Sequence, residues 1–417
     1  MAALARWVAA ALLSFAGAAP AADLCLAAPS DAQLPALQAQ LDRWQRETGQ
    51  RVELVKLSNA GSDVFVQYRT WLAAHSPAVD VYKLDSQWVG QLGAHLLDLG
   101  PRVDEARRMF PNVLEAYRAP DGALLALPYT VGVPLLYYRR DLLQRYGLPV
   151  PKTWTELTTT ARRIRAGERA AGRRAPWGYV FQAAAYEGLT ANAMEWIASN
   201  GGGRIVEPDG RISVNNPRAA AALRLAASWV GDIAPRGVLN YREDDARGVF
   251  QTGDAVFMRN WPAIWELLRT ERGSAVAGRF DVAPLPAGEA GRVAATLGGW
   301  GFAVSRHSRR QEQAVRLVQF LTREEAQRDY ARRGLPPTYP ALYDDPQLIR
   351  EAPLLPLLKD IVPQALARPS APTGRHYAEV STEFWSATHE VLEGRTDPAA
   401  ALAGLDAILR QVRRQGW

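Results

Sequence analysis

Two tryptophans have sequence neighbours that are unusual for a tryptophan of a protein core. Trp300 lies in the stretch TLGGWGFAVS, among glycines and just before an apolar run, and Trp261 lies in FMRNWPAIWEL, where a strand-like run gives way to a helix. Indole faces stack on the apolar C–H faces of sugar rings, and sugar hydroxyls need carboxylate, amide or guanidinium partners. We therefore interpret both rings as binding platforms. Core packing of Trp300 and a hydrophobic staple at Trp261 remain alternatives.

Other kinds of site chemistry find little support. The sequence has a single cysteine, Cys25. Its five histidines never show the paired spacing of a zinc-binding helix; they are His75, His95, His307, His376 and His389. There is no G-x-S-x-G elbow before a helix and no G-x-x-x-x-G-K phosphate loop. We expect no metal, no cofactor and no catalytic residue. The carboxylates alone do not exclude a glycosidase pair.

Composition indicates a globular chain of two domains. The 417 residues are 48% hydrophobic and 22% charged, which is enough for a sizeable core. The formal net charge is +6, but short basic runs such as Arg173-Arg174 and Arg332-Arg333 are scattered along the sequence. Nucleic-acid binding requires basic residues gathered on one face, so we do not expect it.

The N-terminus predicts export. Arg6 precedes an apolar run that ends in small residues, the pattern of a secretory signal peptide over residues 1–22. The run is shorter than the ~20 residues that a membrane span needs. We therefore expect a periplasmic protein. Lipidation of Cys25 is an alternative, but Asp23 and Leu24 fit a lipoprotein signal poorly, and we expect Cys25 on a first strand.

The elements that must position the tryptophans alternate between strands and helices. The strand-like runs LCLAAP, RVELVKL and VDVYKLD are separated by amphipathic helices over residues 34–47 and 64–74. This rhythm predicts an α/β fold, in which ligands bind at the ends of strands. A second α/β unit begins near Trp154. Two further strands, RFDVAPLPAG and GWGFAVS, precede a mostly helical remainder.

Five segments together resemble the extracellular solute-binding proteins of carbohydrate ABC importers, most of all the trehalose/maltose-binding branch. They occur in this order: VDVYKLDSQWVGQL, then LPYTVGVPLLYYRRDLLQRYGL with VPKTWTEL, then WGYVFQAAAYEGLTANAMEWIASNGG, then GDAVFMRNWPAIWE, and finally VAPLPAG with ATLGGWGFAVS. The resemblance covers essentially the whole mature chain. It implies a monomer that binds a disaccharide such as trehalose or maltose and delivers it to membrane permease subunits.

The resemblance also implies a two-lobed periplasmic-binding-protein fold of type II, with the sugar held between the lobes. The N-terminal lobe would comprise residues 23–131 and 301–345, and the C-terminal lobe residues 132–300 and 346–417. The chain would cross between lobes near residues 131–134, 298–303 and 345–350. The glycines around Trp300, Gly299 among them, would let a crossing strand run close to the sugar.

Individual site residues follow from the same resemblance, each with a simpler alternative. Asp85 matches an acid at a strand end, where it would otherwise cap a helix, and Tyr129 matches a tyrosine that would otherwise pack within a lobe. Tyr186 and Glu187 fall at a helix start, where Glu187 would otherwise act as a cap. Arg368 matches a late arginine and is otherwise a surface residue. Two looser matches complete the set, Gln33 and Asp63.

One departure concerns the identity of the sugar. The trehalose/maltose-binding proteins tend to carry an acid or amide shortly before LLYY, where this chain reads Val131-Gly132-Val133-Pro134. Loss of one buried polar partner shifts discrimination between similar sugars by roughly 1–3 kcal/mol.

Two functions of other classes compete with sugar binding. A periplasmic glycoside hydrolase would need two carboxylates across one site. A binding protein for a charged small solute, such as a polyamine or glycerol phosphate, would need an acidic cage or a basic cluster in place of stacking tryptophans.

Overall fold

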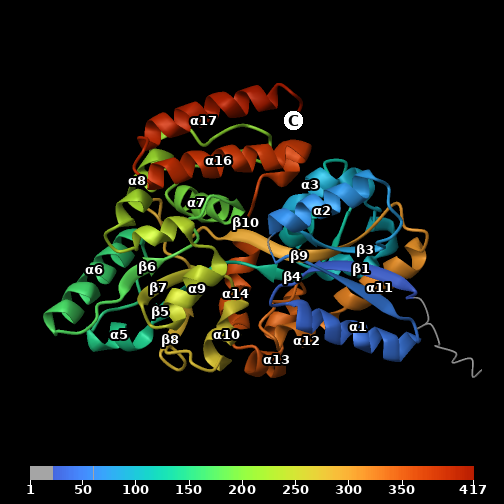
Figure 1. The fold of residues 1–417 in the computed structure, drawn as a ribbon, viewed down its shortest axis with the longest axis horizontal. Helices are drawn as coiled ribbons and strands as arrows, with labels where there is room; N and C mark the ends of the chain where they lie inside the picture. Colours follow the sequence, from blue (N-terminus) through green and yellow to red (C-terminus); the bar gives the residue numbers. More distant parts are fainter. Residues whose placement is uncertain (1–21, 60) are drawn as a thin grey trace, which may run out of the picture.

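Two β-sheets with helices packed around them make up the protein (Figure 1). The computed structural model describes residues 22–59 and 61–417, so the predicted signal peptide lies outside the described residues except for Ala22. The first sheet has the strand order β10-β9-β3-β1-β2, with β4 also paired to β9, and the second has the order β6-β7-β5-β8. The strands are β1 (Leu24–Pro29), β2 (Val52–Leu57), β3 (Val81–Asp85), β4 (Leu127–Gly132), β5 (Leu135–Arg139), β6 (Trp177–Val180), β7 (Ala255–Asn260), β8 (Phe280–Ala283), β9 (Thr296–Val304) and β10 (Leu366–Ala367).

Helices cover both sheets, and the last two long ones, α16 and α17, lie together along one side of the molecule over α7 and α8 (Figure 1). The α-helices are α1 (Leu34–Thr48), α2 (Gly61–Ala73), α3 (Val89–Leu92), α4 (Pro111–Glu115), α5 (Arg140–Arg145), α6 (Trp154–Ala170), α7 (Glu187–Ser199), α8 (Pro217–Trp229), α9 (Glu243–Gln251), α10 (Ile264–Thr270), α11 (Gln311–Thr322), α12 (Glu324–Ala331), α13 (Pro346–Glu351), α14 (Leu355–Ile361), α15 (Ser370–Thr373), α16 (Tyr377–Leu392) and α17 (Pro398–Arg413). The predicted α/β alternation is confirmed.

Local sequence explains where these helices begin and end. In α1, Leu37, Leu41 and Trp44 recur at helical spacing and are buried, and the helix stops at Gly49, whose left-handed φ of 74° is open to glycine. In α6 the side chain of Thr153 accepts a hydrogen bond from the backbone N–H of Glu156 at 3.1 Å and caps the first turn.

Two segments connect the two sheets, and a third leads from the first sheet to the C-terminal helices. Strand β4 ends in the first sheet at Gly132 and β5 begins in the second at Leu135. Strand β9 returns the chain to the first sheet, and its Thr296 hydroxyl donates to the carbonyl of Ala191 in α7 at 3.0 Å. Strand β10 then runs parallel to the start of β9, after which the chain enters α16.

The third crossing predicted from the sequence coincides with a helix. Residues 345–350 were expected to cross between lobes, but Asp345 caps α13 by accepting from two backbone N–H groups, and Pro346 favours the first helical turn. Leu348 of this helix is buried in an apolar cluster that includes residues of both sheets, such as Leu24 of β1 and Met258 of β7. The exact lobe boundaries remain a prediction.

Cys25 lies in β1, as expected, with its backbone N–H donating to the carboxylate of Asp80 at 2.9 Å. Burial, followed by the nearby charges of Glu53 and Asp80, raises the pKa of its thiol to about 11. A raised pKa disfavours the thiolate, which is the reactive form of cysteine.

Candidate functional site

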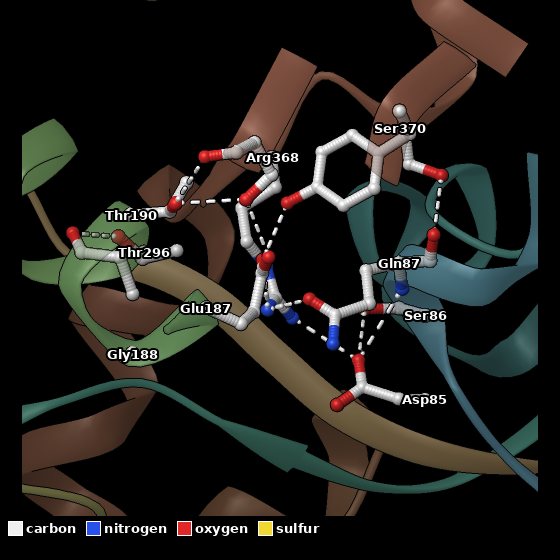
Figure 2. A network of polar contacts seen from close by, with 12 residues as sticks. Asp85, Ser86, Gln87, Glu187, Gly188, Thr190, Thr296, Arg368 and Ser370 are labelled. Atoms are coloured by element: carbon white, nitrogen blue, oxygen red, sulfur yellow. Dashed lines mark hydrogen bonds and ion pairs between the residues drawn. The ribbon is translucent and has the colours of Figure 1, made fainter. Parts of the chain in front are cut away.

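The guanidinium of Arg368 joins side chains from both halves of the fold (Figure 2). Its Nη2 donates to Asp85 Oδ1 at 3.1 Å, and its Nη1 donates to Glu187 Oε1 at 2.9 Å and to the side-chain oxygen of Gln87. Asp85 ends β3 in the first sheet, whereas Glu187 begins α7 beside the second. Arg368 is only 8% exposed, so the predicted surface alternative is wrong for this residue.

Electrostatics hold this arginine in its charged form. Burial lowers the pKa of Arg368, but the carboxylates of Asp85 and Glu187 outweigh burial and leave the pKa above its ordinary value. Glu187 also accepts hydrogen bonds from the hydroxyls of Tyr377 at 2.5 Å and Ser381 at 2.6 Å. Burial nevertheless raises the pKa of the Glu187 carboxyl, an effect that Arg368 and these hydroxyls only partly offset.

Asp85 has a second task at the strand end. Its Oδ1 accepts from the backbone N–H of Gln87 at 3.3 Å, which caps the short 3-10 turn over Ser86–Trp88. The capping alternative is therefore present in a side chain that also pairs with Arg368, and its contact with a sugar stays a prediction.

Trp300 lies directly opposite Asp85, in the antiparallel pair of β9 with β3. The ammonium group of Lys83 stands 4.5 Å from the centre of the Trp300 ring, and the edge of Trp88 meets it with ring centres 5.6 Å apart. Lys83 is fully buried and donates to Asp31 at 2.6 Å, and burial lowers its pKa. Trp300 is thus backed by a fixed cation and remains partly exposed.

Trp261 repeats this arrangement on the second sheet. The guanidinium of Arg259 lies 4.2 Å from the Trp261 ring centre and forms a fully buried bidentate pair with Glu195, at 2.5 and 3.1 Å. The Trp261 indole N–H donates to Glu243 at 3.4 Å, and the ring is partly exposed. The same Glu243 accepts from the Tyr186 hydroxyl at 2.8 Å, so Tyr186 and Trp261 share one carboxylate.

The glycines near Trp300 have a packing role, and their predicted approach to a sugar stays a prediction. A Cβ on Gly298 would lie 3.1 Å from the six-membered ring of Trp261, and a Cβ on Gly299 would lie 2.6 Å from the carbonyl oxygen of Thr130. Gly299 also adopts a φ of +145°, which L-residues rarely take. These glycines therefore admit Trp261 and the backbone of β4 close to β9.

The same contact relates the two tryptophans in space. Gly298 and Trp300 are two residues apart on β9, and alternate residues of a strand share one face. Trp261 packs over Gly298, so both indoles lie on one face of β9, and Trp300 pairs with Asp85 of the Arg368 network.

The remaining predicted residues form no hydrogen bond with Arg368 in the described part of the chain, but the backbone N–H of Gln33 donates at 3.0 Å to Asp31, the partner of Lys83. Tyr129 is fully buried, stacks on Phe302 with ring centres 4.6 Å apart, and donates to Gln33 at 2.5 Å. The structure therefore favours the packing alternative for Tyr129, which orients the partly exposed Gln33 at the start of α1. Asp63 is exposed in α2 and accepts from the Ser58 hydroxyl at 3.0 Å.

Known proteins share both the sequence and this architecture. Residues 28–328 match the family described as bacterial extracellular solute-binding protein. A probable ABC transporter-binding protein of Deinococcus radiodurans is 41% identical over 380 residues, which cover 90% of each chain. The chain belongs to the bacterial extracellular solute-binding family.

Solved structures agree with this assignment. The maltose-bound MalE3 of T. maritima has 33% identity and a TM-score of 0.86, with 93% of this chain and 99% of that chain covered. The GacH receptor of Streptomyces glaucescens, solved unliganded and with acarbose, has 21% identity and a TM-score of 0.81, with 93% and 97% covered, and shows the fold alone. The predicted two-lobed fold is confirmed.

As a family member, this solute-binding protein is the binding component of an ABC transporter rather than an enzyme, and the family acts outside the cytoplasmic membrane. In the described part of the chain, no helix is long and apolar enough to cross a membrane.

Sequence reasoning missed several members of the site of this solute-binding protein: Asp31, Lys83, Gln87, Glu243, Tyr377 and Ser381. Gln87 lies two residues after Asp85 in the same KLDSQW stretch, so its place beside the predicted acid could have indicated it. Glu243 opens α9 in an acidic run that reads as an ordinary helix start. From the sequence alone, Lys83 would be interpreted as an exposed strand residue, because its sequence neighbours do not indicate that it pairs with Asp31.

Proposed function

We propose that this protein binds a neutral disaccharide, such as maltose or trehalose, between its two lobes and delivers it to the permease subunits of a sugar ABC importer. The proposal rests on one observation above others: two partly exposed indoles, each with a buried cation on its ring, lie on one face of the crossing strand β9. The maltose in the MalE3 structure supports the same ligand class.

The polar groups around the rings suit sugar hydroxyls. Asp85 and Glu187 are carboxylates whose charge is balanced by Arg368, so the network offers hydrogen-bond acceptors and donors together. An acidic cage for a polyamine would need carboxylates without such a partner, and a phosphate site would need an arginine without two acids on it. The charged-solute alternative is therefore disfavoured, and family membership argues against the hydrolase.

Stacking on Trp261 and Trp300 predicts a specific loss on truncation. In titration calorimetry with maltose and trehalose, Trp261→Ala and Trp300→Ala should each weaken binding at least about tenfold, or about 1.4 kcal/mol. The matched control is Trp177→Ala, since Trp177 also carries a cation, Arg165, at 4.5 Å from its ring but lies on β6 away from the network. The platform assignment fails if both variants bind sugar as tightly as the parent and the control.

A further inference from the structure

Three histidines from distant parts of the sequence converge on the first lobe, away from the Arg368 network. One ring nitrogen each of His75, His95 and His307 lies within 4.8 Å of the other two. His95 Nδ1 and His307 Nε2 are 3.1 Å apart although the residues are 212 positions apart in the chain. Sequence spacing gave no hint of this cluster, because zinc-site patterns count on ligands close together in the chain.

Backbone pairing fixes two of the three ligands. Leu96 and Ser305 form an antiparallel bridge just beyond the end of β9, and the backbone N–H of Arg306 donates to the carbonyl of His95 at 2.9 Å. His95 and His307 therefore lie beside this bridge on paired segments. Such a backbone support is stiffer than two surface loops would be.

The third ligand is held by an unusual backbone. His75 follows α2 and adopts a φ of 53°, the single positive φ of a non-glycine residue in residues 22–59 and 61–417. Its ring stacks on that of His307 with centres 4.4 Å apart, and the residue is exposed. The left-handed conformation thus directs an exposed imidazole toward the other two.

We propose that His75, His95 and His307 form a binding site for a divalent transition-metal ion of the Zn²⁺ class. Zinc–nitrogen bonds of about 2.0–2.1 Å in tetrahedral geometry place ligand nitrogens about 3.4 Å apart, near the His95–His307 separation. His75 must leave its stacked position to complete the set, which its exposure allows. Three imidazoles and a water in the fourth position make a recurring zinc arrangement, and imidazole does not suit Mg²⁺ or Ca²⁺.

The groups around the three histidines suit a metal site of modest affinity. Burial lowers the pKa of His95 and of His307, with further lowering from neighbouring histidine and Arg306 charges, which favours the neutral rings that bind metals. No ion pair between a carboxylate and any of these three rings occurs within the described chain, whereas the cation Arg306 stands nearby and donates to Leu96. The metal would tie the end of α2 to the segments beyond β9, which predicts added thermal stability.

Calorimetry with ZnCl₂ on the EDTA-treated full chain, prepared without an affinity histidine tag, tests the site. One equivalent of Zn²⁺ should bind with a dissociation constant below about 10 µM, and MgCl₂ should give no binding heat. His75→Asn and His307→Gln should each weaken Zn²⁺ binding at least about tenfold. Asparagine is chosen at position 75 because it tolerates a positive φ. Melting curves should show a Zn²⁺-dependent rise for the parent and none for His75→Asn.

Two controls make the outcome decisive. His389→Gln removes a histidine outside the cluster and should leave Zn²⁺ affinity within about twofold. Trp261→Ala should bind Zn²⁺ like the parent, so failure of sugar binding and failure of the metal site are distinguished. The proposal is overturned if the parent binds no stoichiometric Zn²⁺, or if His75→Asn, folded by its melting curve, binds it as tightly as the parent.

Discussion

At the scale of single residues, Arg368 carries the most interactions that the sequence could not show. Its two ion-pair partners lie 283 and 181 positions away along the chain. Local patterns could mark Trp261 and Trp300, because an indole beside glycine or proline is unusual in a core. They could not reveal which charge would meet Asp85 or which cations would back the rings, since those pairings depend on how the elements fold together.

The Arg368 network predicts a large effect of one substitution. Arg368→Met removes the buried cation and leaves Asp85 and Glu187 without their shared partner, which should cost about 3–5 kcal/mol of unfolding free energy. Urea denaturation measures this loss. Arg224→Met serves as the control, because the ion pair of Arg224 with Asp397 is largely exposed and should contribute about 0–1 kcal/mol. Equal stability of the two variants would show that the Arg368 pairs contribute no more than surface ones.

At the scale of elements, long periodic segments were predictable and short irregular ones were not. The helix expected over residues 34–47 is α1, Leu34–Thr48, and the one expected over 64–74 is α2, Gly61–Ala73. Their apolar residues repeat over several turns, so the signal accumulates. Strand β10 has two residues, Leu366–Ala367, and exists because β9 offers an edge there. No local pattern in the sequence predicts such a short strand.

Two glycine-to-alanine changes should have opposite effects on stability, because one glycine lies where β4 packs closely on β9 and the other lies in an exposed helix. Gly299→Ala should lower the unfolding free energy by about 2 kcal/mol or more, since its Cβ would meet the Thr130 carbonyl and its φ of +145° is strained for alanine. Gly404→Ala, in the exposed interior of α17 with open space around it, should raise stability by about 0.5–1 kcal/mol. Thermal and urea unfolding of both variants separates these cases, and a stabilised Gly299→Ala would contradict the packing role.

At the scale of the whole molecule, two lobes joined by crossing segments are expected to change their relative position on binding sugar. Asp85 and Trp300 belong to the first sheet, whereas Glu187 and Trp261 belong to the second half, so a sugar that contacts all four makes more contacts when the lobes approach. A ligand shifts a conformational equilibrium only through such differential contact. Small-angle X-ray scattering should therefore show a smaller radius of gyration with saturating maltose or trehalose than without it. The Trp261→Ala/Trp300→Ala double variant, at the same sugar concentration, should keep the ligand-free profile because it lacks both platforms. Superimposable profiles of the parent with and without a sugar that calorimetry shows to be bound would rule out closure, and the crossing segments would then act as rigid connections rather than as hinges.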